Sequence, residues 1–158
     1  MRRTDREIIN PQESSAVIQE CQVCRLALSR DGQLDIVPLS FRYDRNALNF
    51  HTAAEGMKID PRTANPAVGF EFGTAVERIM WADPPCQWSL YSQSVIGTGT
   101  LRELPDGEEK IHGLHEIVSC FAGCTRAFYQ QQQLENNRVW KLTIEIISGM
   151  RSAGKDGA

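Results

Sequence analysis

The chain has 158 residues, 41% of them hydrophobic and 23% charged, with a formal net charge of -3 and a pI near 5.6. These values fit one packed domain, and the acidic balance gives no long-range attraction for nucleic acid or anionic lipid. No apolar segment of signal-peptide type follows the charged N-terminal run, and no stretch is long enough to cross a bilayer. We therefore expect a cytoplasmic protein with one domain over residues 1–149 and a flexible tail over residues 150–158.

The first half of the chain predicts a helix and four strands. A helix over Pro11–Glu20 begins with Pro and has apolar residues at helical spacing. The strands are expected at Val23–Ser29, Leu34–Tyr43, Ala47–Thr52 and Ala67–Phe72, with turns at Asp31-Gly32 and Asp44-Arg45-Asn46 and a helix that begins near Lys58. The turn residues join most of these strands as neighbours, which predicts an antiparallel meander.

The second half adds two longer strands around a helix. A fifth strand, Ser92–Leu104, contains Gly97 and Gly99, where a barrel strand must bend or carry a bulge. The remaining elements are expected as a helix over Glu108–Phe121 and a sixth strand over Arg138–Ser148, while Thr74–Gln87 reads as a long loop and Tyr129–Asn137 as a segment without a role in the core. Six strands and about three helices indicate a mainly β (α+β) fold whose sheet closes on itself.

The segment Phe50–Pro66, FHTAAEGMKIDPRTANP, joins the end of an apolar strand to a basic helix start. Backbone N–H groups at such a turn lack partners, and the positive end of a helix dipole adds to the charge of Lys58. This combination predicts a clamp for the phosphate of a cofactor.

Five cysteines, Cys21, Cys24, Cys86, Cys120 and Cys124, occur without a secretory signal, so a disulfide framework is not expected. Cys21 and Cys24 form a CxxC pair that would bind zinc or act as a redox dithiol if a second pair or a helix N-terminus were present. No second CxxC exists, and Cys120 lies in an apolar run, so burial as a small hydrophobic residue is the better interpretation.

Three separated motifs occur in a familiar order: VCRLALSRDGQLDIVPLSFRYD, LNFHTAAEGMKID with NPAVGFEF, and CQWSLYSQSVIGTGTLREL. In these motifs the chain resembles the pyridoxamine 5′-phosphate oxidase-like FMN-binding split-barrel superfamily, most closely its nitroimidazole-resistance (Nim-type) branch. The resemblance extends from about Arg2 to Gly149. It implies a six-stranded antiparallel split β-barrel with flanking short helices, a homodimer, and two FMN sites at the dimer interface.

The resemblance places the flavin ring along Val37, Pro38, Leu39 and Ser40. Pro38 removes one donor from the strand ladder, so neighbouring backbone groups would face a ring that offers donors and acceptors. An ordinary proline on an edge strand is the alternative.

The family's phosphate and ribityl clamp corresponds to His51 and Thr52 together with Gly56, Met57 and Lys58. Lys58 matches the phosphate-binding lysine. The family often has Arg or His before that lysine, and Met57 removes this charge-assisted contact.

His51 falls where Nim-type proteins keep a histidine near the flavin, and it is the candidate catalytic residue, as a donor of a hydrogen bond or proton. A structural histidine is the alternative. Trp88 and Ser94 lie in the segment that the family places near the cofactor and the partner subunit, and Trp88 would stack on the ring or anchor the interface. The Trp81–Trp88 loop and Trp140 are expected to supply anchors for the homodimer.

The sequence thus predicts an FMN-dependent oxidoreductase acting on a small molecule, with nitroimidazole or nitroaromatic reduction as the activity that the resemblance implies. The alternatives are a pyridoxamine-phosphate-oxidase-like oxidase, for which a clear basic set for a second phosphate is lacking, and a non-catalytic flavin- or haem-binding protein. No metal site, membrane contact or nucleic-acid partner is expected.

Overall fold

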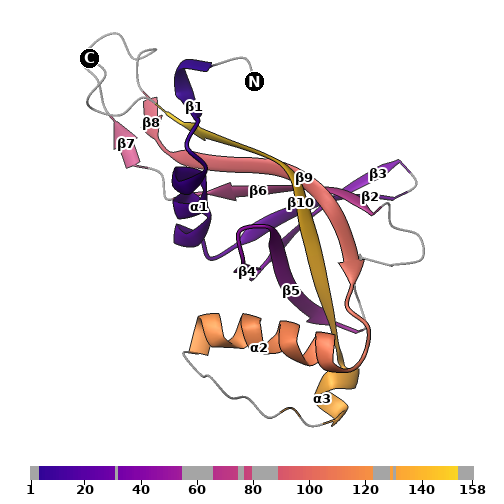
Figure 1. Ribbon diagram of the computed structural model, residues 1–158. Helices are drawn as coiled ribbons and strands as arrows, with labels where there is room; N and C mark the ends of the chain where they lie inside the picture. Colours follow the sequence, from indigo (N-terminus) through magenta and orange to yellow (C-terminus); the bar gives the residue numbers. More distant parts are fainter. Residues whose placement is uncertain are drawn as a thin grey trace.

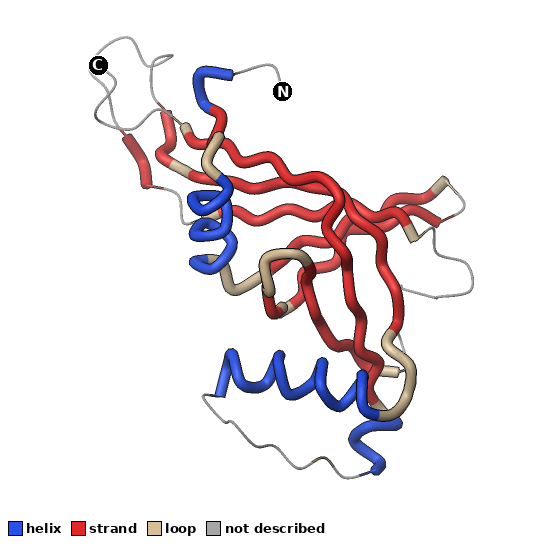
Figure 2. The backbone as a smooth tube through the Cα atoms, viewed as in Figure 1, coloured by secondary structure: helices blue, strands red, loops and turns tan. Residues whose placement is uncertain are grey.

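The computed structural model describes residues 4–30, 32–54, 66–74, 77–79, 89–122, 129 and 131–152. Within these ranges the chain forms one strongly curved antiparallel sheet with helices placed at different ends of it (Figures 1 and 2). The strands of this sheet are β1 (Glu7–Ile8), β2 (Cys24–Arg30), β3 (Gln33–Leu39), β4 (Arg42–Tyr43), β5 (Ala47–Ala53), β6 (Ala67–Gly73), β9 (Gln93–Glu103) and β10 (Asn137–Arg151). A separate pair consists of β7 (Glu77–Ile79) and β8 (Ser89–Tyr91), and the helices are a 3-10 turn (Thr4–Arg6), α1 (Pro11–Glu20), α2 (Glu108–Ala122) and α3 (Gln131–Glu135).

Helix α1 has the predicted bounds for identifiable local reasons. The Asn10 side chain accepts a hydrogen bond from the Gln12 N–H at 3.0 Å, which caps the first turn, and Pro11 needs no partner at this position. Val17 and Ile18 are buried against the sheet. The helix therefore closes one end of the sheet, as its apolar spacing predicted.

The sheet confirms the predicted split barrel, with one change. Its order is β3-β2-β6-β9-β10-β5-β4, and all ladders are antiparallel. The predicted single strand Leu34–Tyr43 is two strands, because β3 pairs with β2 whereas β4 pairs with β5. The chain changes partner at Ser40 and Phe41, which lie outside both strands. The two ends of the strand order are thus consecutive in the chain, and this continuity closes the barrel.

The longest ladder joins β9 and β10, and its bulge lies in β10 rather than in the glycine-containing strand β9 for which it was predicted. Ile144 is opposite Gly99 and Ile146 is opposite Thr98, so Glu145 is an extra residue that forms a β-bulge. A Cβ atom at Gly97 would overlap the carbonyl oxygen of Ile146, and one at Gly99 would overlap that of Thr143. The glycines are therefore required by the close approach of the bulged strand.

The barrel interior holds the main core, and α2 covers a smaller one. The inner cluster includes Phe50, Phe70, Phe72, Trp140 and Leu142, and the cluster under α2 consists of Leu104, Leu114, Ile117 and Val139. The Trp140 Nε1–H donates to Thr52 Oγ1 at 3.0 Å inside the barrel. The prediction that Trp140 anchors a dimer contact is wrong, because its side chain is 2% exposed within its own chain.

Three further element predictions need correction. Part of the predicted Thr74–Gln87 loop is regular, since Glu77–Ile79 pairs with Ser89–Tyr91. The segment expected to have no core role contains α3, and its Tyr129 and Leu134 pack against the cluster under α2. The last strand ends at Arg151 rather than Ser148, because the ladder with β9 continues to the pair Arg151 and Gln93, so residues 150 and 151 are not part of a tail.

The CxxC pair lies at the junction between α1 and β2, and both thiols are free. Cys24 is 1% exposed, and burial, assisted by the nearby Glu71 carboxylate, raises its pKa to about 12. Burial also raises the pKa of Cys21. Thiolate is the reactive form, so this pair packs the junction rather than acting as a dithiol centre. Cys86 and Cys124 lie outside the described residues, as does the side chain of Cys120.

No described helix has the length and apolar character that a membrane span requires.

Two glycine substitutions should separate close approach from ordinary strand propensity. Gly99→Ala is expected to lower the free energy of unfolding by about 1–3 kcal/mol, because the new methyl group meets backbone. Gly69→Ala is the matched control, since its Cβ would lie 3.6 Å from the Ala27 Cβ in normal contact. It should be neutral or stabilising by about 0.5–1 kcal/mol. Urea unfolding measures both, and equal effects would contradict the role assigned to the bulge.

Cys24 should resist alkylation in the folded protein. At pH 8 almost no thiolate is present when the pKa is about 12, so iodoacetamide should label the Cys24 peptide only after unfolding in urea, as measured by site-resolved mass spectrometry. The folded pKa lies above the ordinary value of about 8.5. The corresponding stabilisation is therefore present below pH 8.5 and is lost as the pH rises toward 12. Native labelling as fast as in urea would refute this prediction.

Candidate functional site

The described residues contain no group of three or more His, Cys, Asp or Glu side chains placed to hold a metal ion. With Cys24 buried, Cys21 half-buried and the pKa of both thiols raised by burial, redox chemistry at this junction is also disfavoured. The candidate site is therefore the region that the sequence assigned to flavin.

The predicted ring-binding segment lies at the end of β3. Val37 and Leu39 are half-buried and pack against the main core, whereas Pro38 and Ser40 are exposed on the outer side. Because β3 is the end strand of the sheet and pairs only with β2, its second edge offers backbone N–H and C=O groups to a ligand. Pro38 thus lies on an edge strand. This position fits both a proline beside the flavin ring and an ordinary proline on an edge strand.

The predicted clamp begins at the end of β5. His51 is exposed and lies opposite Val139, on the face that α2 covers farther along the strand. Thr52 points into the barrel, where its hydroxyl accepts the bond from Trp140 and keeps its own hydrogen for donation. Gly56, Met57 and Lys58 lie outside the described residues.

The register places these two segments on either side of the split in the barrel. Arg42 is paired with Asn49, so counting back two residues in an antiparallel register brings Ser40 level with His51. The β4–β5 ladder does not extend to this level. Ser40 lies outside both strands, and β3, which precedes it, pairs with β2 rather than with β5. The unpaired stretch between β3 and β5, called the opening below, is therefore bordered by the predicted ring-binding segment and by the start of the predicted clamp.

Ser94 lies far from this opening within one chain. It is half-buried and paired with Met150, whereas His51 is opposite Val139 at the other end of β10. Eleven residues separate Val139 from Met150, which corresponds to about 36 Å along an extended strand. Ser94 is not brought to the opening by its own chain, and Trp88 lies outside the described residues.

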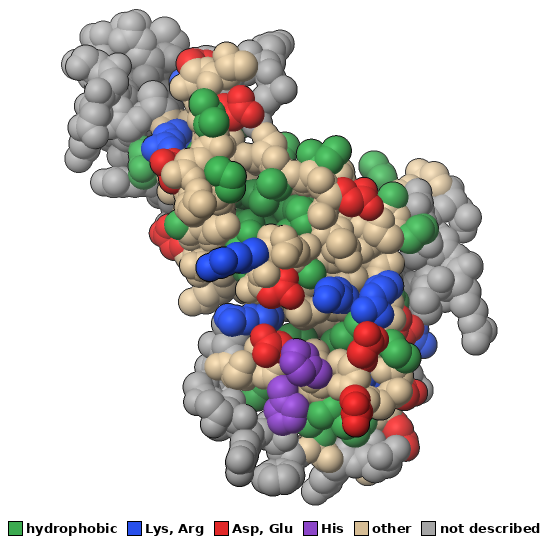
Figure 3. Space-filling model, viewed as in Figure 1, with side chains coloured by type: hydrophobic (Ala, Val, Ile, Leu, Met, Phe, Trp, Pro, Cys, Tyr) green, Lys and Arg blue, Asp and Glu red, His purple; other side chains and the backbone are tan. Residues whose placement is uncertain are grey.

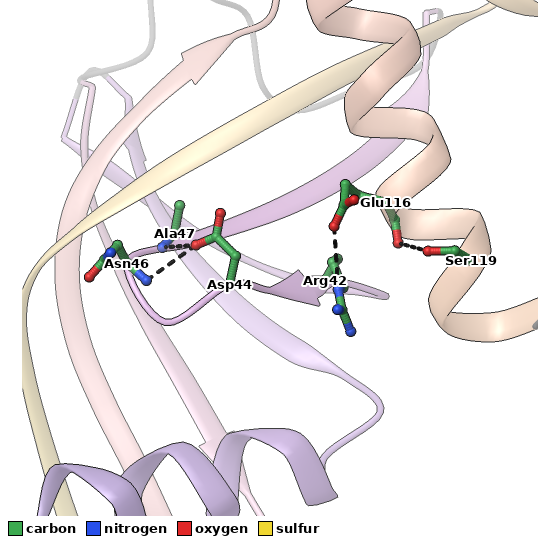
Figure 4. Close-up of polar contacts among 6 residues, drawn as sticks. All are labelled: Arg42, Asp44, Asn46, Ala47, Glu116 and Ser119. Carbon is green, nitrogen blue, oxygen red and sulfur yellow. Dashed lines mark hydrogen bonds and ion pairs between the residues drawn. The ribbon is translucent and has the colours of Figure 1, made fainter. Parts of the chain in front are cut away.

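Polar contacts at the predicted Asp44 turn, together with an ion pair that the sequence analysis did not identify, form a network on either side of β4 beside the opening (Figure 4). Asp44 Oδ1 accepts the N–H groups of Asn46 at 3.2 Å and of Ala47 at 2.8 Å, which closes the turn. Arg42 Nε lies 3.7 Å from Glu116 Oε2 on α2. The network holds the turn and the helix on the two sides of β4, and so sets where the chain leaves β5.

A groove of about 180 Å³ runs between α2 and the sheet, near this network. Its charges are of both signs, and Arg102 pairs with Glu109 at 3.2 Å, which lowers the pKa of that carboxyl. The paired charges make this groove a solvated seam rather than a binding site.

A larger groove of about 480 Å³ lies between α1, the β4–β5 turn and β10. Arg45, Tyr43 and Ser15 contribute polar groups, and Ile144 and Ile147 form an apolar floor. None of its lining residues belongs to the predicted flavin site. The sequence offered little signal for it, because it depends on the bulge in β10.

Comparisons with known proteins agree with the fold. A family model described as pyridoxamine 5′-phosphate oxidase matches residues 10–151. An uncharacterized protein of Rhizobium meliloti (strain 1021) is 28% identical over 109 residues, which is 66% of this chain and 64% of that protein. The match thus spans slightly less than two thirds of this relative.

Solved structures share the architecture at low identity. A proposed 5-nitroimidazole antibiotic resistance protein from Bacteroides thetaiotaomicron superposes with a TM-score of 0.78 at 24% identity, covering 94% of this chain and 90% of that one. The flavocytochrome Anf3 from Azotobacter vinelandii gives 0.83 at 13%, covering 98% and 72%. The FAD and haem binding protein from Mycobacterium smegmatis gives 0.81 at 16%, covering 94% and 74%.

These identities show a common fold and leave the substrate open. Because the family model matches nearly the whole chain, from residue 10 to residue 151, the protein belongs to the pyridoxamine 5′-phosphate oxidase family.

Proposed function

We propose that this protein binds FMN at the opening between β3 and β5 and uses it for redox chemistry on a small molecule, with nitroimidazole or nitroaromatic reduction as the leading reaction. The observation that carries the proposal is the placement of Val37–Ser40 and of His51–Thr52 on the two sides of this opening. The family match supports a flavin, and the likeness to a proposed nitroimidazole resistance protein supports the Nim-type branch.

The described residues fit the chemistry of a flavin. A planar ring with donors and acceptors suits the free edge of β3, where Pro38 and Ser40 are exposed. Thr52 is buried with its hydroxyl bonded to Trp140 inside the barrel, so of His51 and Thr52 only His51 presents its side chain at the opening. Lys58 is the cation assigned to the phosphate, as the sequence predicted.

Flavin, when bound, supplies the electron transfer, and the protein supplies position and electrostatics. His51 is exposed at the opening, where an imidazole can hold or donate a proton near neutral pH. Its role is to donate a hydrogen bond or a proton to the reacting group, with the electrons taken from an external donor such as NAD(P)H.

Two other functions are weaker candidates. Structures of a flavocytochrome and of a FAD and haem binding protein share this fold, which favours a non-catalytic flavin- or haem-binding protein as the second candidate. An oxidase acting on a pyridoxamine phosphate ranks lower, because the sequence lacks a clear basic set for a second phosphate.

We also propose that the protein is a homodimer. The outer face of the sheet exposes Ile36, Ile96 and Ile146 on three different strands, and β-sheet faces of this kind usually need a cover. A site completed by Ser94 would need a second chain, since Ser94 lies about 36 Å along β10 from the level of His51 in its own chain. Rotational symmetry of a dimer would supply Ser94 from the partner.

Removing the phosphate cation should weaken flavin binding. Lys58→Ala is expected to cost about 1.5–3 kcal/mol of FMN affinity, the scale of a charged hydrogen bond, with the fold intact. Met57→Arg should tighten binding by restoring a charge. Lys155→Ala, outside the family match, is the control. FMN fluorescence titration measures all three, and unchanged affinity in folded Lys58→Ala would refute the clamp.

The same preparations test the reaction. A bound flavin that is reduced by NAD(P)H or dithionite without oxygen and reoxidised by a 5-nitroimidazole supports the enzyme. A Soret band supports haem binding instead. A colourless protein that does not take up FMN would overturn the proposed function.

A charge on the outer face should separate the subunits. Ile96→Asp is expected to give a folded chain of about 17.7 kDa in light scattering at micromolar concentration, where the unmodified protein gives twice that mass. Gln132→Asp is the control, because Gln132 is exposed on α3, outside this sheet. A monomeric unmodified protein, or a dimeric Ile96→Asp variant, would contradict the homodimer.

A further inference from the structure

We infer that the 480 Å³ groove between α1, the β4–β5 turn and β10 binds a small organic acid with an apolar body, independently of the flavin site. Its volume lies in the range of small-molecule sites, about 300–1,000 Å³. Figure 3 shows hydrophobic side chains (green) exposed between α1 and the central strands.

The floor of the groove is a product of the bulge in β10. In a regular strand, residues three apart point to opposite faces. The extra residue Glu145 shifts the register, so Ile144 and Ile147 both line the groove. Ile147 is 39% exposed there, which leaves apolar surface for a ligand to cover.

One face of α1 forms the opposite wall. Gln12, Ser15 and Gln19 recur at helical spacing and all line the groove, while Val17 and Ile18 face the core. The Ser15 Oγ lies 3.1 Å from the Tyr43 hydroxyl. Only one of these two hydroxyl hydrogens is used between them, so the pair retains a donor for a ligand.

Arg45 supplies the charge. Among the described residues that line the groove, it is the only charged one. Of the seven arginines whose side chains the structure describes, six lie within 4.0 Å of a carboxylate: Arg6, Arg25, Arg42, Arg102, Arg138 and Arg151. Arg45 is the seventh, and it has no carboxylate partner in the described part of the chain.

The backbone holds Arg45 at the tip of the turn. Its φ of 73° is a left-handed conformation that is uncommon for residues other than Gly, Asn and Asp. The two bonds to Asp44 Oδ1 stabilise this turn, and the Asn46 carbonyl accepts the Ile144 N–H at 2.9 Å. This last hydrogen bond connects the turn that carries Arg45 directly to β10, which carries the isoleucines of the apolar floor.

These features select the class of ligand. One guanidinium without a second cation matches a carboxylate, which it can bind through two parallel hydrogen bonds. The isoleucine floor suits an apolar body, and the hydroxyl pair with the two glutamines provides the polar edge. A small aromatic or aliphatic carboxylate satisfies all of these groups.

The test is titration with benzoate and with its neutral isostere benzamide, followed by amide and methyl NMR shifts. Saturable benzoate binding with shifts at Ser15, Ala16 and Ile147, at least tenfold tighter than benzamide, is expected. Arg45→Gln should weaken benzoate at least tenfold and remove the preference over benzamide. Ile147→Ser should weaken both probes. Arg102→Gln, an exposed arginine on the α2 side, is the control and should change neither.

Excess FMN is present throughout, so that a probe at the proposed flavin site would be displaced. No saturable binding to the folded protein, competition between benzoate and FMN, or equal losses in Arg45→Gln and Arg102→Gln would each overturn the assignment. Because the readout needs no flavin turnover, failure of the proposed function leaves this test unchanged.

Discussion

The close packing of β9 against the bulged part of β10 is the constraint on which the rest of the structure depends. Gly97 and Gly99 leave no room for a Cβ, and Glu145 is accommodated opposite them as an extra residue. Bulges increase strand twist and bend, so this one helps two long strands curve from the α1 end of the sheet to the α2 end (Figure 2). The same extra residue places both Ile144 and Ile147 in the groove beside α1. Curvature and the groove floor thus have one cause.

A second constraint is that one stretch of chain serves two ladders. Between β3 and β4 the chain leaves β2 and joins β5, and Phe41 stays buried at this point with its ring 4.8 Å from that of Phe72. That aromatic contact anchors the crossover in the core while Ser40 remains exposed. An open edge beside a fixed anchor is a suitable place for a planar ligand, because the edge offers backbone groups and the anchor fixes the position of that edge.

Local signals in the sequence were enough for α1, α2, the Asp44 turn and five of the six barrel strands, whereas α3 was missed. Pro11 indicated a helix start, the Asp44 turn a chain reversal and Gly97 a close approach of two strands, and the structure has each of these features. The partner change at Ser40 was missed because the apolar pattern continues through it, and pairing is a tertiary choice. Trp140 was misassigned because alternation gives two faces without saying which is inside. For the site, the sequence indicated the segments beside the opening. The groove at Arg45 could not be predicted, because it depends on the register shift at the bulge, and the residue type of Glu145 does not indicate a bulge.

The charge pattern is compatible with the two anion sites that we propose for an acidic chain. With a net charge of -3, a broad positive field is absent, and six of the seven arginines whose side chains are described lie within 4.0 Å of a carboxylate. Exposed charges are also screened beyond about 8 Å at physiological ionic strength. In the proposed roles, Lys58 and Arg45 would therefore act only on groups that reach hydrogen-bond distance. Discrimination at each site must come from the geometry of its neighbouring donors: a free strand edge that suits a ring at β3, and a hydroxyl pair over isoleucines that suits a compact acid at α1.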